Sequence, residues 1–165
     1  MDGVQFDGIT FKDQFGLLRA GRPRGILEQI GYKLRALLLY RREHPKNARY
    51  LLFGDDVERD TEAFLLFGET CAGLRGPPLA DRLRALGVHK SDVASAVSLA
   101  DALPIERDPV AHVFIHEVRK RRVAAMDDAR VHVAPTVEEH AKTLFALGKI
   151  RDADVDAVLC DPSVP

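Results

Sequence analysis

The amino-acid sequence predicts an α/β fold in which helices flank a parallel sheet. Short apolar runs typical of strands alternate with longer segments in which apolar residues recur every three or four positions, the pattern of amphipathic helices. One such run, residues 50–53, leads directly into Gly54-Asp55-Asp56. Alternating strands and helices favour α/β layers over a helix bundle. A length of 165 residues, 46% of them apolar, is that of a single domain.

The first half of the chain is expected to hold an edge strand, a helix and a buried strand. Residues 4–12 alternate apolar and polar side chains, which indicates a short strand or hairpin edge. From Gly25 to about Glu43 the apolar residues form one wide helical stripe, which His44-Pro45 ends. Residues 50–53 are apolar on every side, which predicts a central parallel strand buried on both faces.

The strand should be followed by a helix that begins near Asp60 and ends at Gly73. Asp60-Thr61-Glu62 supplies first-turn acids and a side-chain cap. Gly76-Pro77-Pro78 predicts a break. The remaining elements are expected as helices at 79–86 and 91–102, a β-rich run at 110–118, an extended piece at 131–134, and helices at 136–147 and 153–159.

Composition limits the function classes. The chain has 24 Lys and Arg against 25 Asp and Glu, so no overall positive charge draws it to nucleic acid. Cys71 and Cys160 are too far apart for a zinc motif and too few for a disulfide framework. The first residues lack a signal peptide, and the chain has no run of 18 apolar residues, so we expect no transmembrane segment and a cytoplasmic location.

The strongest candidate site follows the apolar run 50–53. In open α/β sheets, ligands bind outside the carboxyl ends of the strands, where Asp55 and Asp56 are expected to lie. Asp60, one turn further on, is close enough in sequence to face the same loop. Mg²⁺ needs only one or two protein carboxylates when waters and a substrate phosphate complete its octahedron. The alternative is a tight turn followed by the acidic residues that helix N-termini favour.

Lys33 favours the interpretation of the acidic residues as a Mg²⁺ site. It falls at the border of the apolar stripe of the preceding helix, where a purely solvated lysine is less expected. A half-buried cation that points to the strand edge would stabilise an anionic phosphoryl group. The alternative, a lysine whose stem lies along the helix flank with its ammonium group in water, stays open.

Two further groups have weaker claims. His112 and His116 are four apart, which suits a metal only on a helix; on the strand expected here they would lie roughly 13 Å apart. Residues 119–122, Arg-Lys-Arg-Arg, are either a phosphate-binding run or a solvated turn.

A third group resembles a nucleophile motif only superficially. Asp152, Asp154 and Asp156 imitate paired phosphatase aspartates. No apolar strand precedes them, so they indicate the start of a helix.

The segments with Lys33 and residues 54–60 resemble the haloacid-dehalogenase superfamily. More narrowly, they are similar to bacterial relatives of the actin-patch-type phosphatidate phosphatase catalytic domain. The resemblance spans most of residues 2–159 and is weakest over 76–105. It rests on the segments DGVQFDGITFKDQ, EQIGYKLRALL, YLLFGDDVERDTEAFLLF, HVFIHEV and VHVAPTVEEHAKTLFALGKI, in that order.

The resemblance implies a partial Rossmann-like sheet with a magnesium site. Lys33 would be the basic residue that contacts the phosphoaspartyl group, and Asp55, Asp56 and Asp60 would hold Mg²⁺. The family's first two motifs, a strand ending in two aspartates one residue apart and a strand ending in Ser or Thr, do not occur in the sequence. The 165 residues would then be the C-terminal part of such a domain, from a truncated or mis-started reading frame.

Three functions follow as expectations. The first is a domain of a Mg²⁺-dependent hydrolase of phosphate monoesters, with a phosphatidate-like lipid among its candidate substrates, that is inactive as this chain because the nucleophile is absent. The second is a non-catalytic module that binds Mg²⁺ and a phosphorylated small molecule or lipid. The third is a polyanion-binding protein centred on residues 119–122. Loss of a neighbouring strand would also leave an unpaired edge on strand 50–53 and favour self-association.

Overall fold

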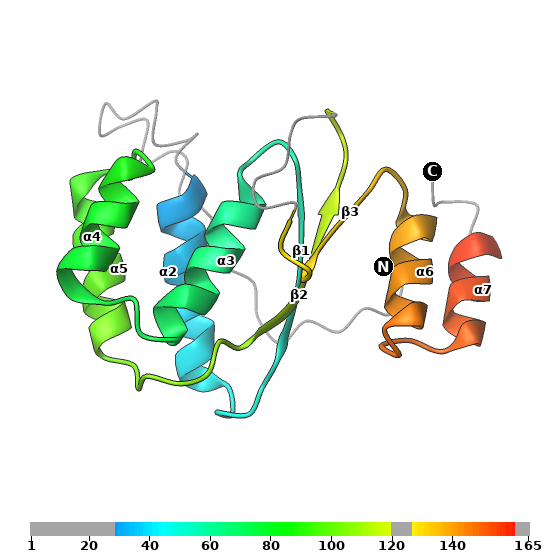
Figure 1. Cartoon of the computed structure of the whole chain (residues 1–165), viewed down its shortest axis with the longest axis horizontal. Helices are drawn as coiled ribbons and strands as arrows, with labels where there is room; N and C mark the ends of the chain where they lie inside the picture. The colour runs from blue at the N-terminus through cyan, green and yellow to red at the C-terminus, as the bar shows by residue number, and fades with distance from the viewer. Residues whose placement is uncertain (1–28, 120–126, 161–165) are drawn as a thin grey trace.

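Three parallel strands form the centre of the molecule, with helices on either side (Figure 1). The computed structural model describes residues 29–119 and 127–160. The sheet order is β1-β2-β3, and both pairings are parallel. The strands are β1 (Tyr50–Asp55), β2 (Val110–His116) and β3 (Val131–Ala134). The predicted α/β fold with a parallel sheet and flanking helices is therefore confirmed.

The helices form layers on both sides of the sheet. On one side α3 lies against the strands, α2 packs beside α3, and α4 and α5 lie outermost; α6 and α7 form a hairpin on the other side (Figure 1). The helices are α2 (Gln29–Glu43), α3 (Asp60–Cys71), α4 (Gly76–Ala85), α5 (Lys90–Asp101), α6 (Val137–Ala146) and α7 (Asp152–Cys160). None of the helices in these ranges is long and apolar enough to cross a membrane.

The main core lies between α3 and one face of the sheet. Leu52, Val113 and Ile115 share that face and are buried. Phe67 of α3 is fully buried and meets Tyr50 edge-on, with ring centroids 5.3 Å apart. Because α3 is covered by the sheet on one side and by α2 on another, most of its residues are buried.

The prediction that strand 50–53 is central and buried on both faces was wrong for the described sheet. β2 is the central strand, and β1 lies at an edge. Leu52 is buried, but Phe53, on the opposite face, is 57% exposed. The buried strand is β2, where Val113, Phe114 and Ile115 are all covered. An apolar run alone does not show which of two such strands is central.

Two other local expectations were also wrong. Gly76-Pro77-Pro78 is the first turn of α4, since proline without an N–H suits positions that lack an intrahelical partner. No side chain caps α3: Arg59, in left-handed conformation, precedes it, and Asp60 already belongs to the helix. The helix predicted from Gly25 is described only from Gln29, and the strand predicted at 4–12 lies outside the described residues.

Candidate functional site

The acidic loop, residues 55–60, leaves the carboxyl end of β1 and enters α3. Asp55 is the last residue of β1, and Asp60 is the first of α3. Lys33 reaches this loop from the N-terminal half of α2, which runs antiparallel to β1 and so places its own N-terminal end near the end of the strand. Helix, strand and second helix therefore bring one cation and several carboxylates together at one edge of the sheet.

Asp60 holds this arrangement together. It is only 6% exposed. One carboxylate oxygen accepts a hydrogen bond from Nζ of Lys33, 27 residues earlier in the chain, and the other accepts one from the backbone N–H of Asp55 (3.0 Å). A buried carboxylate needs a charged partner and hydrogen bonds, and Asp60 has both.

Lys33 has a second partner that the sequence analysis missed. Its ammonium group also donates to Oε2 of Glu58 at 3.0 Å. The lysine side chain is 18% exposed and that of Glu58 is 42% exposed, so the site opens to solvent on the Glu58 side. Glu58 lies within residues 54–60, Gly-Asp-Asp-Val-Glu-Arg-Asp. Its place in this segment is the only sign in the sequence that it belongs to the site.

The other two aspartates bind backbone N–H groups. Oδ1 of Asp55 accepts from the N–H groups of Val57 (2.8 Å) and Glu58 (3.2 Å), which closes the turn after β1. Asp56 accepts from the N–H groups of Val118 (2.9 Å) and Arg119 (3.0 Å). Asp56 thus ties the loop after β1 to the loop after β2.

The three aspartates do not converge on one point as a ready-made cation site. Within residues 29–119 and 127–160 no group of three or more His, Cys, Asp or Glu side chains is arranged to hold a metal ion. Oδ2 of Asp55 accepts no hydrogen bond from a residue in the described ranges, whereas Oδ1 of Asp56 accepts two hydrogen bonds and its Oδ2 accepts one. One or two carboxylates are enough for Mg²⁺ when waters and a phosphate supply the remaining ligands.

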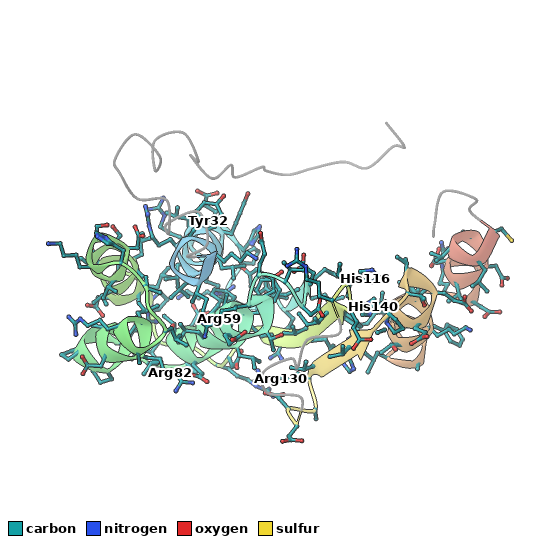
Figure 2. All side chains as sticks on the ribbon, turned by 90° about the horizontal axis from the view of Figure 1, so that it is seen from above. Tyr32, Arg59, Arg82, His116, Arg130 and His140 are labelled. Carbon is teal, nitrogen blue, oxygen red and sulfur yellow. The ribbon has the colours of Figure 1, made fainter. Side chains whose placement is uncertain are left out.

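A second polar group, a histidine layer, lies on the other face of the sheet. Four of the chain's 6 histidines are in it: His112 and His116 on β2, His132 on β3 and His140 on α6. Nδ1 of His112 and Nε2 of His132 share a hydrogen bond of 3.1 Å. His116 and His140 face each other between β2 and α6, with ring centroids 6.2 Å apart (Figure 2). Sequence spacing points only to the two histidines of β2, His112 and His116.

Burial disfavours the charged form of His112, His132 and His140. It lowers the pKa of His140, and the neighbouring His116 lowers it further. Burial also lowers the pKa of His112 and of His132, with His132 adding to the effect on His112. His140 is 8% exposed, and neither of its ring nitrogens has a hydrogen-bond partner in the described structure.

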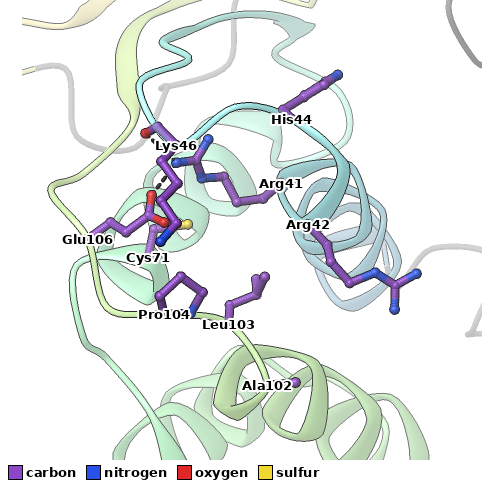
Figure 3. A pocket seen from close by; sticks show the side chains of 9 residues that line it. All are labelled: Arg41, Arg42, His44, Lys46, Cys71, Ala102, Leu103, Pro104 and Glu106. Atoms are coloured by element: carbon purple, nitrogen blue, oxygen red, sulfur yellow. Dashed lines mark hydrogen bonds and ion pairs between the residues drawn. The ribbon is translucent and has the colours of Figure 1, made fainter.

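A cavity of about 220 Å³ lies near the other end of α2, away from Lys33 (Figure 3). The buried Arg41 donates to Glu106 and to the carbonyl oxygens of Pro45 (2.8 Å) and Lys46 (2.6 Å). Burial raises the pKa of the Cys71 thiol to about 11. The charge of Arg41 is already compensated by Glu106 and the two carbonyl oxygens. Because its pKa is raised, the Cys71 thiol is a poor nucleophile at neutral pH.

The remaining candidates have structural partners or lie outside the described ranges. Asp152, Asp154 and Asp156 lie on α7, as the helix interpretation predicted, and Asp154 pairs with Arg151 (3.0 Å). Of the basic run, Arg119 donates its backbone N–H to Asp56, and residues 120–122 lie outside the described residues.

No protein-family model, curated protein sequence or solved structure matches this chain.

Proposed function

We propose that Lys33 and the acidic loop bind Mg²⁺ together with the phosphoryl group of a phosphorylated small molecule or lipid, as the magnesium and phosphate part of a haloacid-dehalogenase-type phosphatase site. The observation that supports this most is the contact of Lys33 with Asp60 and Glu58 at the carboxyl end of β1. Ligands of open α/β sheets bind at this edge.

The residue types suit that chemistry. Asp55 and Asp56 offer hard oxygen ligands of the kind Mg²⁺ prefers. Mg²⁺, when bound, would neutralise charge on a phosphoryl group. Lys33 supplies a fixed positive charge beside the carboxylates, and phosphoryl transfer depends mainly on such positioning and charge compensation. Asp60 keeps the lysine in place through its buried ion pair.

Hydrolysis needs more than these four residues. A carboxylate must attack phosphorus and a second group must move the proton. The 165-residue sequence has no apolar strand that ends in two aspartates one residue apart. We therefore propose that this chain binds the ligand without hydrolysing it. Where another segment supplies the nucleophile, the same residues would form part of a phosphatase domain.

Calorimetric titration with Mg²⁺, in the presence and absence of inorganic phosphate, tests the proposal. We expect binding of phosphate that depends on Mg²⁺, with affinity reduced at least tenfold in Asp55→Asn and in Lys33→Met. Asp101→Asn, an exposed aspartate at the end of α5, is the matched control. Absence of Mg²⁺-dependent phosphate binding in the wild type would overturn the proposal.

A turnover assay separates the two forms of the proposal. With p-nitrophenyl phosphate and Mg²⁺ we expect no release of nitrophenol by this chain. Release that Asp55→Asn abolishes would show that the chain is itself a phosphatase, with a nucleophile other than a pair of aspartates at the end of an apolar strand. Binding without release supports the non-catalytic module.

A further inference from the structure

The backbone of β1 has one edge that no strand of the described residues pairs with. Tyr50 donates its N–H to Pro109 and Asp56 donates its N–H to His116, so the even-numbered residues of β1 bond towards β2. Backbone direction alternates along a strand, and the N–H and C=O groups of Leu51 and Phe53 therefore point to the open edge. The N–H of Asp55 points the same way and is bound by Asp60.

The side chains at this edge are also open. Phe53 stacks on Phe114 with ring centroids 4.9 Å apart and an interplanar angle of 13°. Phe114 is buried, whereas Phe53 is the most exposed aromatic residue of the sheet. Leu51 lies on the same face, and α6 covers the β2 and β3 side of that face. An exposed apolar edge strand with unpaired backbone groups is a template for another strand.

We propose that a second copy of this chain pairs with β1 in antiparallel orientation, with the twofold axis at Leu52. Leu51 of each copy then lies opposite Phe53 of the other, and both residues have their backbone groups directed at the partner. The two pairs exchange four N–H···O=C bonds. The interface is isologous, and it joins two three-stranded sheets into one of six strands.

Charge complementarity selects this register. With Leu52 on the axis, Arg49 lies opposite Asp55 of the second copy on the face that carries Phe53. Arg49 is exposed, has no ion-pair partner in the described ranges and makes one long bond of 3.3 Å to the Val110 carbonyl. Opposite charges directly across an antiparallel pair stabilise it.

The neighbouring registers fit less well. An axis at Phe53 places Leu51 opposite Asp55, whose backbone N–H is already bound by Asp60. An axis at Leu51 places Arg49 opposite Phe53 and leaves both charges unpaired. Of the three registers, only the axis at Leu52 places Leu51 opposite Phe53 and Arg49 opposite Asp55.

The dimer should be weak and dependent on concentration. One pair of short strands with two exposed aromatic rings buries less surface than the roughly 1,200 Å² typical of stable complexes. We expect a monomer–dimer equilibrium in the micromolar range or above, measured by sedimentation velocity over a wide range of concentration. Phe53→Lys and Arg49→Asp should each shift the dissociation constant upward at least tenfold.

Phe145→Lys, which places the same charge on an exposed aromatic site of α6, is the control and should leave the equilibrium unchanged. Circular dichroism melts check that each variant is folded. A wild-type monomer at all concentrations, or a dimer that the β1 variants do not weaken, would overturn the proposal.

Cysteine pairing tests the register. In a Cys160→Ser background, Leu51→Cys and Phe53→Cys are oxidised separately and as a mixture. Opposed hydrogen-bonded residues have Cα atoms about 5.5 Å apart, within the range of a disulfide. We expect the cross-linked dimer in the mixture and little in either variant alone. Efficient self-cross-linking of Phe53→Cys would show the axis at Phe53 and contradict the proposed register.

Discussion

Asp60 packs directly against the backbone of Gly54, so closely that a β-carbon at position 54 would overlap the aspartate side chain. This contact lets the buried carboxylate reach the N–H of Asp55 while it holds Lys33. The glycine of the GDD sequence is therefore required by the approach of Asp60 and not by an unusual backbone angle.

Gly54→Ala should destabilise the protein by about 1–3 kcal/mol, the usual cost of overpacking a well-filled site. The added methyl group must displace Asp60 and weaken its bonds to Lys33 and Asp55. Urea unfolding followed by circular dichroism measures the loss. In a double-mutant cycle, Asp60→Ala should cost less in the Gly54→Ala background than alone. Additive effects would show that the two positions are independent.

Lys33→Met should lower the free energy of unfolding by about 2–4 kcal/mol, because it leaves the buried Asp60 carboxylate without its cation. The double variant Lys33→Met, Asp60→Asn should regain part of this loss, since no uncompensated charge then remains. Chemical denaturation of the three variants gives the comparison. Arg42→Met, an exposed cation near the end of the same helix, should change stability little.

The sequence predicted the position of the acidic loop and of Lys33 because both depend on local pattern. An apolar run that leads into Gly-Asp-Asp and a lysine at the border of an apolar stripe are both visible in the sequence. The structure places Lys33 against Asp60, 27 residues later in the chain. This position agrees with the prediction of a half-buried lysine that points to the strand edge. The function assigned to them remains a proposal.

What the sequence could not give were relations set by tertiary packing. Nothing in the pattern of residues 50–53 shows that β2 is the central strand. Nor does spacing reveal that His140 of α6 meets His116 of β2, since the two are brought together only when the hairpin of α6 and α7 lies on the sheet. The role of Asp56 in joining two loops is also a contact between distant segments.

Cys160 should react rapidly with a thiol reagent in the folded protein, and Cys71 should not. Cys160 is exposed, whereas Cys71 is buried with its pKa raised to about 11, so little thiolate forms at pH 8. Dithionitrobenzoate should release one equivalent of thionitrobenzoate quickly and a second only after unfolding. In Cys160→Ser the fast phase should disappear. A fast second equivalent from folded wild type would show that the end of α3 opens to solvent.

Stability should fall as the pH drops below about 6.5, the ordinary pKa of histidine. Burial lowers the pKa of His112, His132 and His140 in the folded state. Between that ordinary value and the lower folded values, the unfolded chain binds protons that the folded chain does not. Proton binding then favours the unfolded state, so the free energy of unfolding decreases as the pH falls through this window. Above the window these histidines are neutral in both states and cause no loss of stability.

His140→Leu should reduce this pH dependence and stabilise the protein at pH 5.5. Its imidazole faces His116 of β2 and His132 of β3; Glu139 on its own helix and the nearby backbone of Ile115 favour its charged form but do not reverse the shift. Leucine removes two buried nitrogens without partners, each of which costs about 1–3 kcal/mol. Urea unfolding at pH 7.5 and 5.5 gives the comparison, with exposed His44→Gln as the control. An unchanged difference between the two pH values would mean that His140 is not buried as a neutral ring against the sheet.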